Sequence, residues 1–223
     1  MKTVSKFFCY CISCLICITA VQPVWAGCVY PPDWQTVPPG TPPTTYQRWT
    51  FDEDENPALP TTYRNDYVPE YENVQAEILG LPIDTWGWYN RYNGRNGVWH
   101  ADSLEMRLHV PNQPGAPSDS YKDIYLGMIY QGDLREPTVA TDVEGQVDRL
   151  CKSVTYLEDG WQRLDMWYRV SPNPSEEWIC IGLGGTGGSI DEVTVETICV
   201  PEPATIALIG LGGLVTRLKK RRT

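Results

Sequence analysis

Short runs in which polar and apolar residues alternate make up most of the chain, and proline and glycine interrupt them often, with 19 of each among 223 residues. Alternation with a period of two is typical of β-strands that have one buried face. Leu104–Val110 alternates most clearly, and the apolar, aromatic run Asp123–Tyr130 is typical of a central strand. We therefore expect an all-β fold over residues 46–199, an antiparallel β-sandwich of eight or nine short strands without a helix.

Two pairs of these runs are separated by turn-forming residues. Residues 147–170 predict a hairpin that turns at the tripeptide Glu158–Gly160. Residues 178–196 predict a second hairpin, which turns at the glycine-rich run 184–188. Glycine fits such turns because it adopts left-handed backbone conformations without steric cost.

The strand expected last in the domain, Ser189–Glu196, carries the sequence Ser-Ile-Asp-Glu-Val-Thr-Val-Glu. It resembles the closing strand of many bacterial jelly-roll domains of the galactose-binding or concanavalin-like kind. The resemblance implies a jelly-roll-like sandwich in which this strand pairs with the N-terminal strand. The aromatic opening Trp49–Asp52 suits that partner.

The N-terminus has the three parts of a secretory signal peptide. Lys2 and Lys6 supply the charge, Phe7–Val21 is apolar, and Val24-Trp25-Ala26 fits the small-residue cleavage rule. Residues 1–26 are therefore expected to be removed on export. Residues 27–45 follow as an extended lead-in that is too rich in proline and threonine to form a helix.

The C-terminus combines a Pro-Glu-Pro triplet (Pro201, Glu202, Pro203), an apolar run over residues 206–215 and a basic cluster over residues 217–222. In this order the three parts resemble the PEP-CTERM sorting signal of Gram-negative bacteria. The resemblance implies an exosortase, a membrane transpeptidase, as a partner that cuts near the triplet. It also implies an exported protein, held first at the inner membrane and then released to the cell surface or the extracellular matrix.

The physical character of this tail agrees with the resemblance. A transmembrane helix over about residues 204–218 is expected within the segment 200–223, although the apolar run is shorter than the roughly 17–25 residues that usually span a bilayer. Basic residues that follow such a helix favour a cytoplasmic C-terminus. An ordinary anchor that is never cut is the alternative.

The charge of the exported part limits its partners. The full chain has 18 Lys and Arg and 28 Asp and Glu, for a net charge of −10. Without the signal peptide and the tail, 11 basic and 27 acidic residues remain, which gives −16. Such a surface argues against binding to nucleic acid or anionic lipid.

Four cysteines remain after the signal peptide, namely Cys28, Cys151, Cys180 and Cys199. An even number in an exported domain predicts two disulfides, and four cysteines allow three connectivities. We favour Cys28–Cys199, which would join the two ends of the domain, with Cys151–Cys180. Residues 25–28 are also close to a lipobox, and lipidation of Cys28 would remove the first pair.

The segment Trp86–Trp99 mixes aromatic residues with Asn, Gly and Arg. Aromatic rings that stack on sugar faces, together with amide and guanidinium groups that bond hydroxyls, are the chemistry of carbohydrate recognition, so we interpret the segment as a polysaccharide-binding loop. The alternative is a loop whose tryptophans cap the core and whose Asn-Gly pair makes a turn. The candidate ligand-binding residues are Trp86, Trp88, Arg91, Tyr92, Arg95 and Trp99.

An acidic run, residues 52–56, could supply oxygen ligands to a structural calcium ion. Asp52 and Asp54, joined by Asp191 from the last strand, are the candidate ligands. The spacing does not fit an EF-hand because no glycine occupies the sixth position. An exposed acidic turn is the alternative.

No known catalytic signature occurs in the chain. His100 and His109 are the only histidines, and neither lies near a nucleophile motif such as G-x-S-x-G or a zinc motif such as H-E-x-x-H. We therefore expect an exported, non-catalytic surface or matrix protein that binds polysaccharide. A purely structural coat or adhesion component is the first alternative, and an extracellular glycoside hydrolase built from scattered carboxylates is the second.

Overall fold

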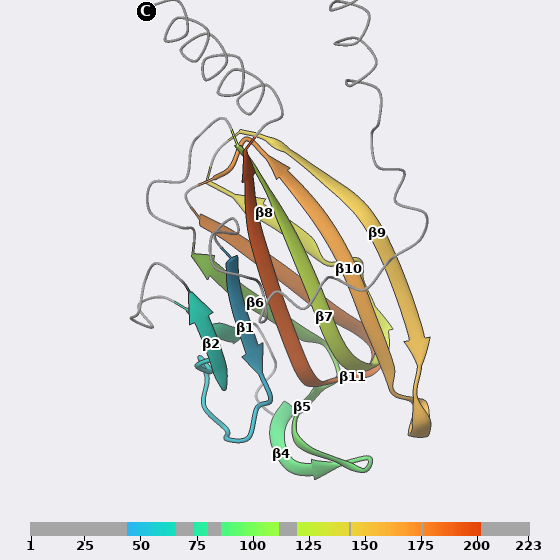
Figure 1. Ribbon diagram of the computed structural model, residues 1–223. Helices are drawn as coiled ribbons and strands as arrows, with labels where there is room; N and C mark the ends of the chain where they lie inside the picture. The colour runs from blue at the N-terminus through green and yellow to red at the C-terminus, as the bar shows by residue number, and fades with distance from the viewer. Residues whose placement is uncertain are drawn as a thin grey trace, which may run out of the picture. The chain divides into compact units, whose positions relative to one another are not determined.

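The computed structural model describes residues 44–65, 74–79, 86–111, 120–142, 144–174 and 176–201 (Figure 1). The predicted signal peptide, most of the lead-in and the predicted transmembrane helix lie outside these residues. Strands dominate the described part, and no helix in it is long and apolar enough to cross a membrane. The strands are β1 (Thr44–Trp49), β2 (Thr62–Asn65), β3 (Ala76–Leu79), β4 (Trp86–Tyr92), β5 (Arg95–Ala101), β6 (Leu104–Pro111), β7 (Ser120–Leu134), β8 (Thr138–Thr141), β9 (Gln146–Tyr156), β10 (Gln162–Ser171) and β11 (Glu176–Pro201), with one short 3-10 turn, η2 (Glu158–Gly160).

The long strand β11 organises the fold because its two halves have different neighbours. Its first half pairs with β6 and β8, and β6 continues to β3. Its second half lies between β1 and β7, and that layer runs in the order β2-β1-β11-β7-β10-β9. The eleven antiparallel strands therefore form one sheet that curls over itself in the manner of a sandwich (Figure 1). This confirms the all-β expectation.

The glycine-rich run is the place where β11 passes from one half to the other. The expected second hairpin is wrong, because residues 178–183 and 190–196 belong to one strand and pair with other strands rather than with each other. Close contacts at this bend explain Gly188 and, on β7, Gly132. A Cβ on Gly188 would lie 2.4 Å from the Cβ of Leu183, and a Cβ on Gly132 would lie 2.5 Å from the Gly187 carbonyl oxygen. The run therefore lies at a closely packed bend within one strand, and it is not the turn of a hairpin.

The core lies between the two halves of the curled sheet, and residues from both line it. The alternation of β6 is confirmed over its first residues, where Leu104, Met106 and Leu108 are buried and Glu105 and Arg107 are exposed. Strand β7 lies between β11 and β10 and is buried over most of its central length, as expected of a central strand. Further buried core residues include Ile124, Leu126, Leu164, Met166, Ile179, Ile181, Val193 and Val195.

Two other pairings were also anticipated. Strands β9 and β10 form the predicted hairpin, and η2 provides its turn with Asp159 and Gly160 in left-handed conformations. The closing strand pairs with the N-terminal strand, with Trp49 opposite Val193. The jelly-roll resemblance therefore anticipated the neighbour of β11 correctly.

The two favoured disulfide pairings are wrong, although Cys151 is disulfide-bonded. Neither Cys180 nor Cys199 forms a disulfide, and each of the three two-disulfide connectivities requires both of them. Their cross-strand neighbours explain this. Cys180 lies between Arg107 of β6 and Thr138 of β8, and Cys199 lies opposite Lys122 of β7. Cys28, expected to join the two ends, lies outside the described residues.

Candidate functional site

The aromatic segment predicted as a loop is a hairpin made of β4 and β5. Its two-residue turn is Asn93-Gly94, with φ values of 44° and 81°. Two successive left-handed residues are the requirement of a type I′ turn, which is why Asn-Gly is favoured there. Strand β5 also pairs with β11 at the bend, with Trp99 opposite Ile190. The hairpin is therefore fixed to the sheet at its base.

Two of the predicted ligand-binding tryptophans attach this hairpin to the rest of the domain. Trp99 is only 3% exposed and belongs to the core. Trp88 packs against the core, and its Nε1 donates a hydrogen bond of 2.7 Å to the carbonyl oxygen of Phe51. Gly97 permits this docking, since a Cβ there would lie 2.4 Å from the same oxygen. The core-capping alternative therefore describes Trp88 and Trp99, while the side chain of Trp86 lies outside the described part of the structure.

Other aromatic residues of the hairpin are accessible. Tyr89 is 42% exposed. Its ring lies 5.5 Å from the ring of half-buried Tyr92, which in turn stacks on His100 at 4.6 Å. His100 is held by a 2.9 Å hydrogen bond between its Nδ1 and Ser189 Oγ. We call Tyr89, Tyr92 and His100 the hairpin aromatic cluster.

Tyr89 and His100 were missed in the sequence, although a signal for His100 was present. The Asn93-Gly94 turn fixes the register of the two strands, which places His100 opposite Gly87. Counting outward from the turn therefore locates His100 on the hairpin. Arg91, predicted as a ligand residue, is exposed on the same hairpin opposite Asn96.

An open recess lies at the tip of the hairpin and extends to the η2 turn between β9 and β10. Its volume of about 480 Å³ lies within the usual range for small-ligand sites. Amides, carboxylates, one guanidinium and one indole line it. These residues are Asn93, Gly94, Arg95, Asn96, Glu158, Asp159, Trp161 and Asp191.

A hydrogen-bond network holds the two turns that border the recess together. Trp161 Nε1 donates to the Asn93 carbonyl oxygen at 3.0 Å, and Asn93 Nδ2 donates to Gln131 Oε1 at 2.9 Å. Gln131 Nε2 then donates to the Asp159 carbonyl oxygen at 3.1 Å. Because these bonds join β4–β5, β7 and η2, the recess has a fixed shape at its floor.

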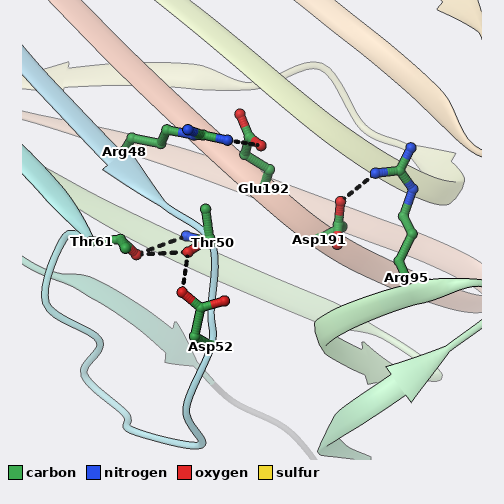
Figure 2. Close-up of polar contacts among 7 residues, drawn as sticks. All are labelled: Arg48, Thr50, Asp52, Thr61, Arg95, Asp191 and Glu192. Carbon is green, nitrogen blue, oxygen red and sulfur yellow. Dashed lines mark hydrogen bonds and ion pairs between the residues drawn. The ribbon is translucent and has the colours of Figure 1, made fainter.

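Arg95 and Asp191 form the main charged contact in the recess. Figure 2 shows them pointing toward one another from β5 and β11, and their Nη1 and Oδ2 atoms are 2.6 Å apart. The guanidinium also lies 5.2 Å from the centre of the Trp161 ring, a cation–π arrangement. Burial raises the pKa of Asp191 above its ordinary value, and Arg95 offsets only part of this effect. Asp191 thus neutralises Arg95, and Glu158 and Asp159 make the remainder of the recess acidic.

The predicted calcium ligands are not brought together. Asp52 accepts a 2.7 Å hydrogen bond from Thr50 Oγ1, Asp54 is exposed, and Asp191 is committed to Arg95 (Figure 2). Across the described ranges, no group of three or more His, Cys, Asp or Glu side chains is placed to hold a metal ion. Calcium therefore gains no support from this geometry, and the exposed acidic turn describes residues 52–56 better.

Comparison with known proteins adds one finding, at the C-terminus. Residues 200–222 match the model of the PEP-CTERM protein-sorting motif. The chain carries a PEP-CTERM sorting motif. The motif supports an exported protein that an exosortase system handles at the membrane. A comparison of the chain with characterised proteins gives no match.

The PEP-CTERM motif begins inside the last strand of the folded domain. Strand β11 ends at Pro201, which pairs with Ser120 of β7, so the first two positions of the matched segment lie in the sheet. Glu202 and Pro203 follow directly outside the described residues. The described β-domain therefore reaches into the first positions of the sorting motif.

Proposed function

We propose that this protein is an exported, non-catalytic component of the cell surface or extracellular matrix, and that the β-domain is the part delivered there. The observation that carries this proposal is the junction of β11 with the PEP-CTERM motif at residues 200–201. Removal of a tail from that point leaves every described strand with the exported product.

We further propose that the β4–β5 hairpin binds polysaccharide through its accessible residues. Tyr89 and Tyr92 offer ring faces for stacking, Arg95 lines the open recess, and exposed Arg91 offers further hydrogen-bond donors on the hairpin. Flat rings next to a few polar groups are what sugar recognition requires. Trp88 and Trp99 support the hairpin from below and are left out of the binding surface.

Co-sedimentation of the purified protein with the producing cell's own extracellular polysaccharide tests this proposal. The double variant Tyr89→Ala/Tyr92→Ala is expected to lose most of the binding. Its free energy of unfolding should stay within about 1 kcal/mol of the wild-type value, as expected for partly exposed positions. Tyr156→Ala is the matched control, because Tyr156 is 81% exposed on β9, outside the hairpin. Equal binding by all three proteins would contradict the proposal, and release of reducing sugars would indicate a glycoside hydrolase instead.

The second candidate function is a purely structural coat component, and the edge strand β9 favours it. Strand β9 ends the strand order β2-β1-β11-β7-β10-β9, so among the described strands it pairs on one side only. It exposes Val147, Leu150 and Tyr156. Long edge strands with exposed apolar residues pair readily with other chains. Concentration-dependent assembly without polysaccharide binding would favour this function over the first.

A further inference from the structure

A lysine and a glutamate are fully buried in contact with each other inside the domain. Lys122 Nζ lies 2.7 Å from Glu177 Oε2, and the two side chains are 1% and 0% exposed. Lysine and glutamate are among the residues least often fully buried. The other ion pairs of the described residues all have at least one partner that is more than a quarter exposed. This pair therefore calls for an explanation of its own.

The two residues come from different halves of the curled sheet. Lys122 lies near the start of β7, opposite Cys199 in the second half of β11. Glu177 lies at the start of the first half of β11, between Val110 of β6 and Thr141 of β8. Their contact therefore spans the interior between the two layers and joins positions 55 residues apart in the chain.

As an ion pair this contact is poorly supported. Glu177 Oε1 is buried and receives no hydrogen bond from the described residues. Burial raises the pKa of the Glu177 carboxyl, and Lys122 offsets only part of that effect. Buried charges are costly unless further hydrogen bonds satisfy them, and here one carboxylate oxygen has none. Burial therefore favours the protonated form of the Glu177 carboxyl.

We propose that Lys122 and Glu177 condense into an intramolecular amide that cross-links the two layers of the domain. The amine nitrogen and the carboxyl group are already in contact, water is excluded, and the product is uncharged. Burial of a neutral amide costs far less than burial of two charges, of which one is incompletely hydrogen-bonded.

The reaction balances without an oxidant or another reactant. The Lys122 ammonium first transfers a proton to the Glu177 carboxylate, which gives a neutral amine and a neutral acid. The Nζ lone pair then attacks Cδ, the Nζ–Cδ bond forms, and Oε2 departs as water with the carboxyl proton and one proton from nitrogen. Oε1 remains as the amide carbonyl oxygen. One water is lost, and no atom changes its oxidation state.

Such a cross-link would act on stability as a disulfide does, by closing a loop in the unfolded chain. It would close the segment from Lys122 to Glu177, which contains β8, β9 and β10. Neither Cys180 nor Cys199 forms a disulfide that could take that role.

Mass spectrometry of the full chain, purified, reduced and denatured, tests the proposal. We expect an intact mass lower by one water than the sequence requires. We also expect a tryptic digest in which Lys122 resists cleavage and its peptide is joined to the peptide that contains Glu177. The control is the double variant Lys122→Met/Glu177→Leu, because replacement of a buried ion pair by apolar residues of similar size is often tolerated. It should fold, show its full mass and unfold at a lower temperature than the cross-linked protein.

Three results would overturn the proposal. The first is a full intact mass with normal cleavage at Lys122. The second is the loss of one water without the joined peptide, which would place the dehydration elsewhere. The third is the loss of one ammonia, which would make a side-chain amide the acyl donor; buried Asn173, within 3.9 Å of Cys199, is the neighbouring amide.

Discussion

The two hairpins that meet at the recess, β4–β5 and β9–β10, are alike at their tips and different in their strands. Both turns contain left-handed residues, Asn93-Gly94 in one and Asp159-Gly160 in the other. In β9–β10 one strand is mostly buried and the other is an exposed edge. In β4–β5 the division lies within the strands, since Trp88 and Trp99 pack inward while Tyr89 is accessible.

This difference shows that strands of a hairpin can carry residues that pack the core and residues that are accessible for binding. An alternating strand such as β10 is explained by its packing alone. The β4–β5 hairpin carries more aromatic surface than its packing uses, and that excess is the basis for assigning it a binding role. The following expectations test the division between residues that support the fold and residues that face solvent.

The largest effect is expected for Trp99→Ala. Removal of a fully buried tryptophan should destabilise the domain by about 3–5 kcal/mol through lost burial and the cavity left behind. Urea denaturation followed by intrinsic fluorescence measures the change. A loss below about 1 kcal/mol, typical of a surface position, would show that Trp99 is not part of the core and would return it to the candidate ligand residues.

The second-largest effect is expected for Gly97→Ala, which should destabilise the domain by about 1–3 kcal/mol. The backbone at this position is left-handed, and the new Cβ would clash with the backbone oxygen of Phe51. Gly94→Ala is the matched comparison, since its nearest neighbour is a side-chain oxygen of Asp159 at 3.5 Å. It should cost only about 1 kcal/mol, for the left-handed conformation alone. Equal losses would show that the hairpin does not dock on residues 50–51 as described.

Tyr168→Phe probes the buried strand of the other hairpin. The Tyr168 hydroxyl donates a 2.6 Å hydrogen bond to the Pro137 carbonyl oxygen, so its removal should cost about 1 kcal/mol at neutral pH. Burial also raises the pKa of Tyr168 to about 12, from 10.0. The folded state holds this proton more tightly, so the wild type should lose stability as the pH rises from 10 to 12.

The phenylalanine variant lacks that proton and should not share this part of the alkaline loss. Denaturation midpoints of both proteins at pH values across that window give the comparison. Parallel pH profiles would mean that the Tyr168 hydroxyl is not in the buried, hydrogen-bonded position described.

The smallest effect is expected for Leu150→Lys on the edge strand β9. Leu150 is 48% exposed, so the free energy of unfolding should change by no more than about 0.5 kcal/mol. A charge on an edge strand discourages pairing with other chains, so any self-association should decrease. Urea denaturation measures the free energy of unfolding, and sedimentation velocity over a range of concentrations measures self-association. A large loss of stability would show that the Leu150 side chain is buried and not exposed on β9.

The features visible in the sequence were those that depend on neighbouring residues. Alternation in residues 104–110 and the turn at residues 158–160 each depend on a few adjacent positions, and both were predicted correctly. Local sequence patterns do not specify which strands pair when those strands are far apart in the sequence. The run 184–188 has the composition of a tight turn, yet Gly188 is explained by its close contact with Leu183 of the same strand.

The candidate site follows the same rule. The segment 86–99 was recognised by its composition, but as a loop, because the alternation that marks a strand is interrupted by Gly87 and by the Asn93-Gly94 turn. The favoured cysteine pairings were wrong for a related reason, although Cys151 is disulfide-bonded. A count of four predicts pairs, but whether Cys180 and Cys199 meet a partner depends on strand neighbours that the count does not contain.

The most direct test of the account is the sequence of both ends of the protein recovered from outside the cell, by N- and C-terminal peptide mapping. A product that starts at Gly27 and ends near Pro201–Pro203, with the basic cluster 217–222 removed, is the expected result. It would mean that the β-domain alone is delivered. A product that retains the chain to Thr223, or carries lipid on Cys28, would contradict delivery to the surface or matrix and would indicate a protein that stays tethered to the membrane.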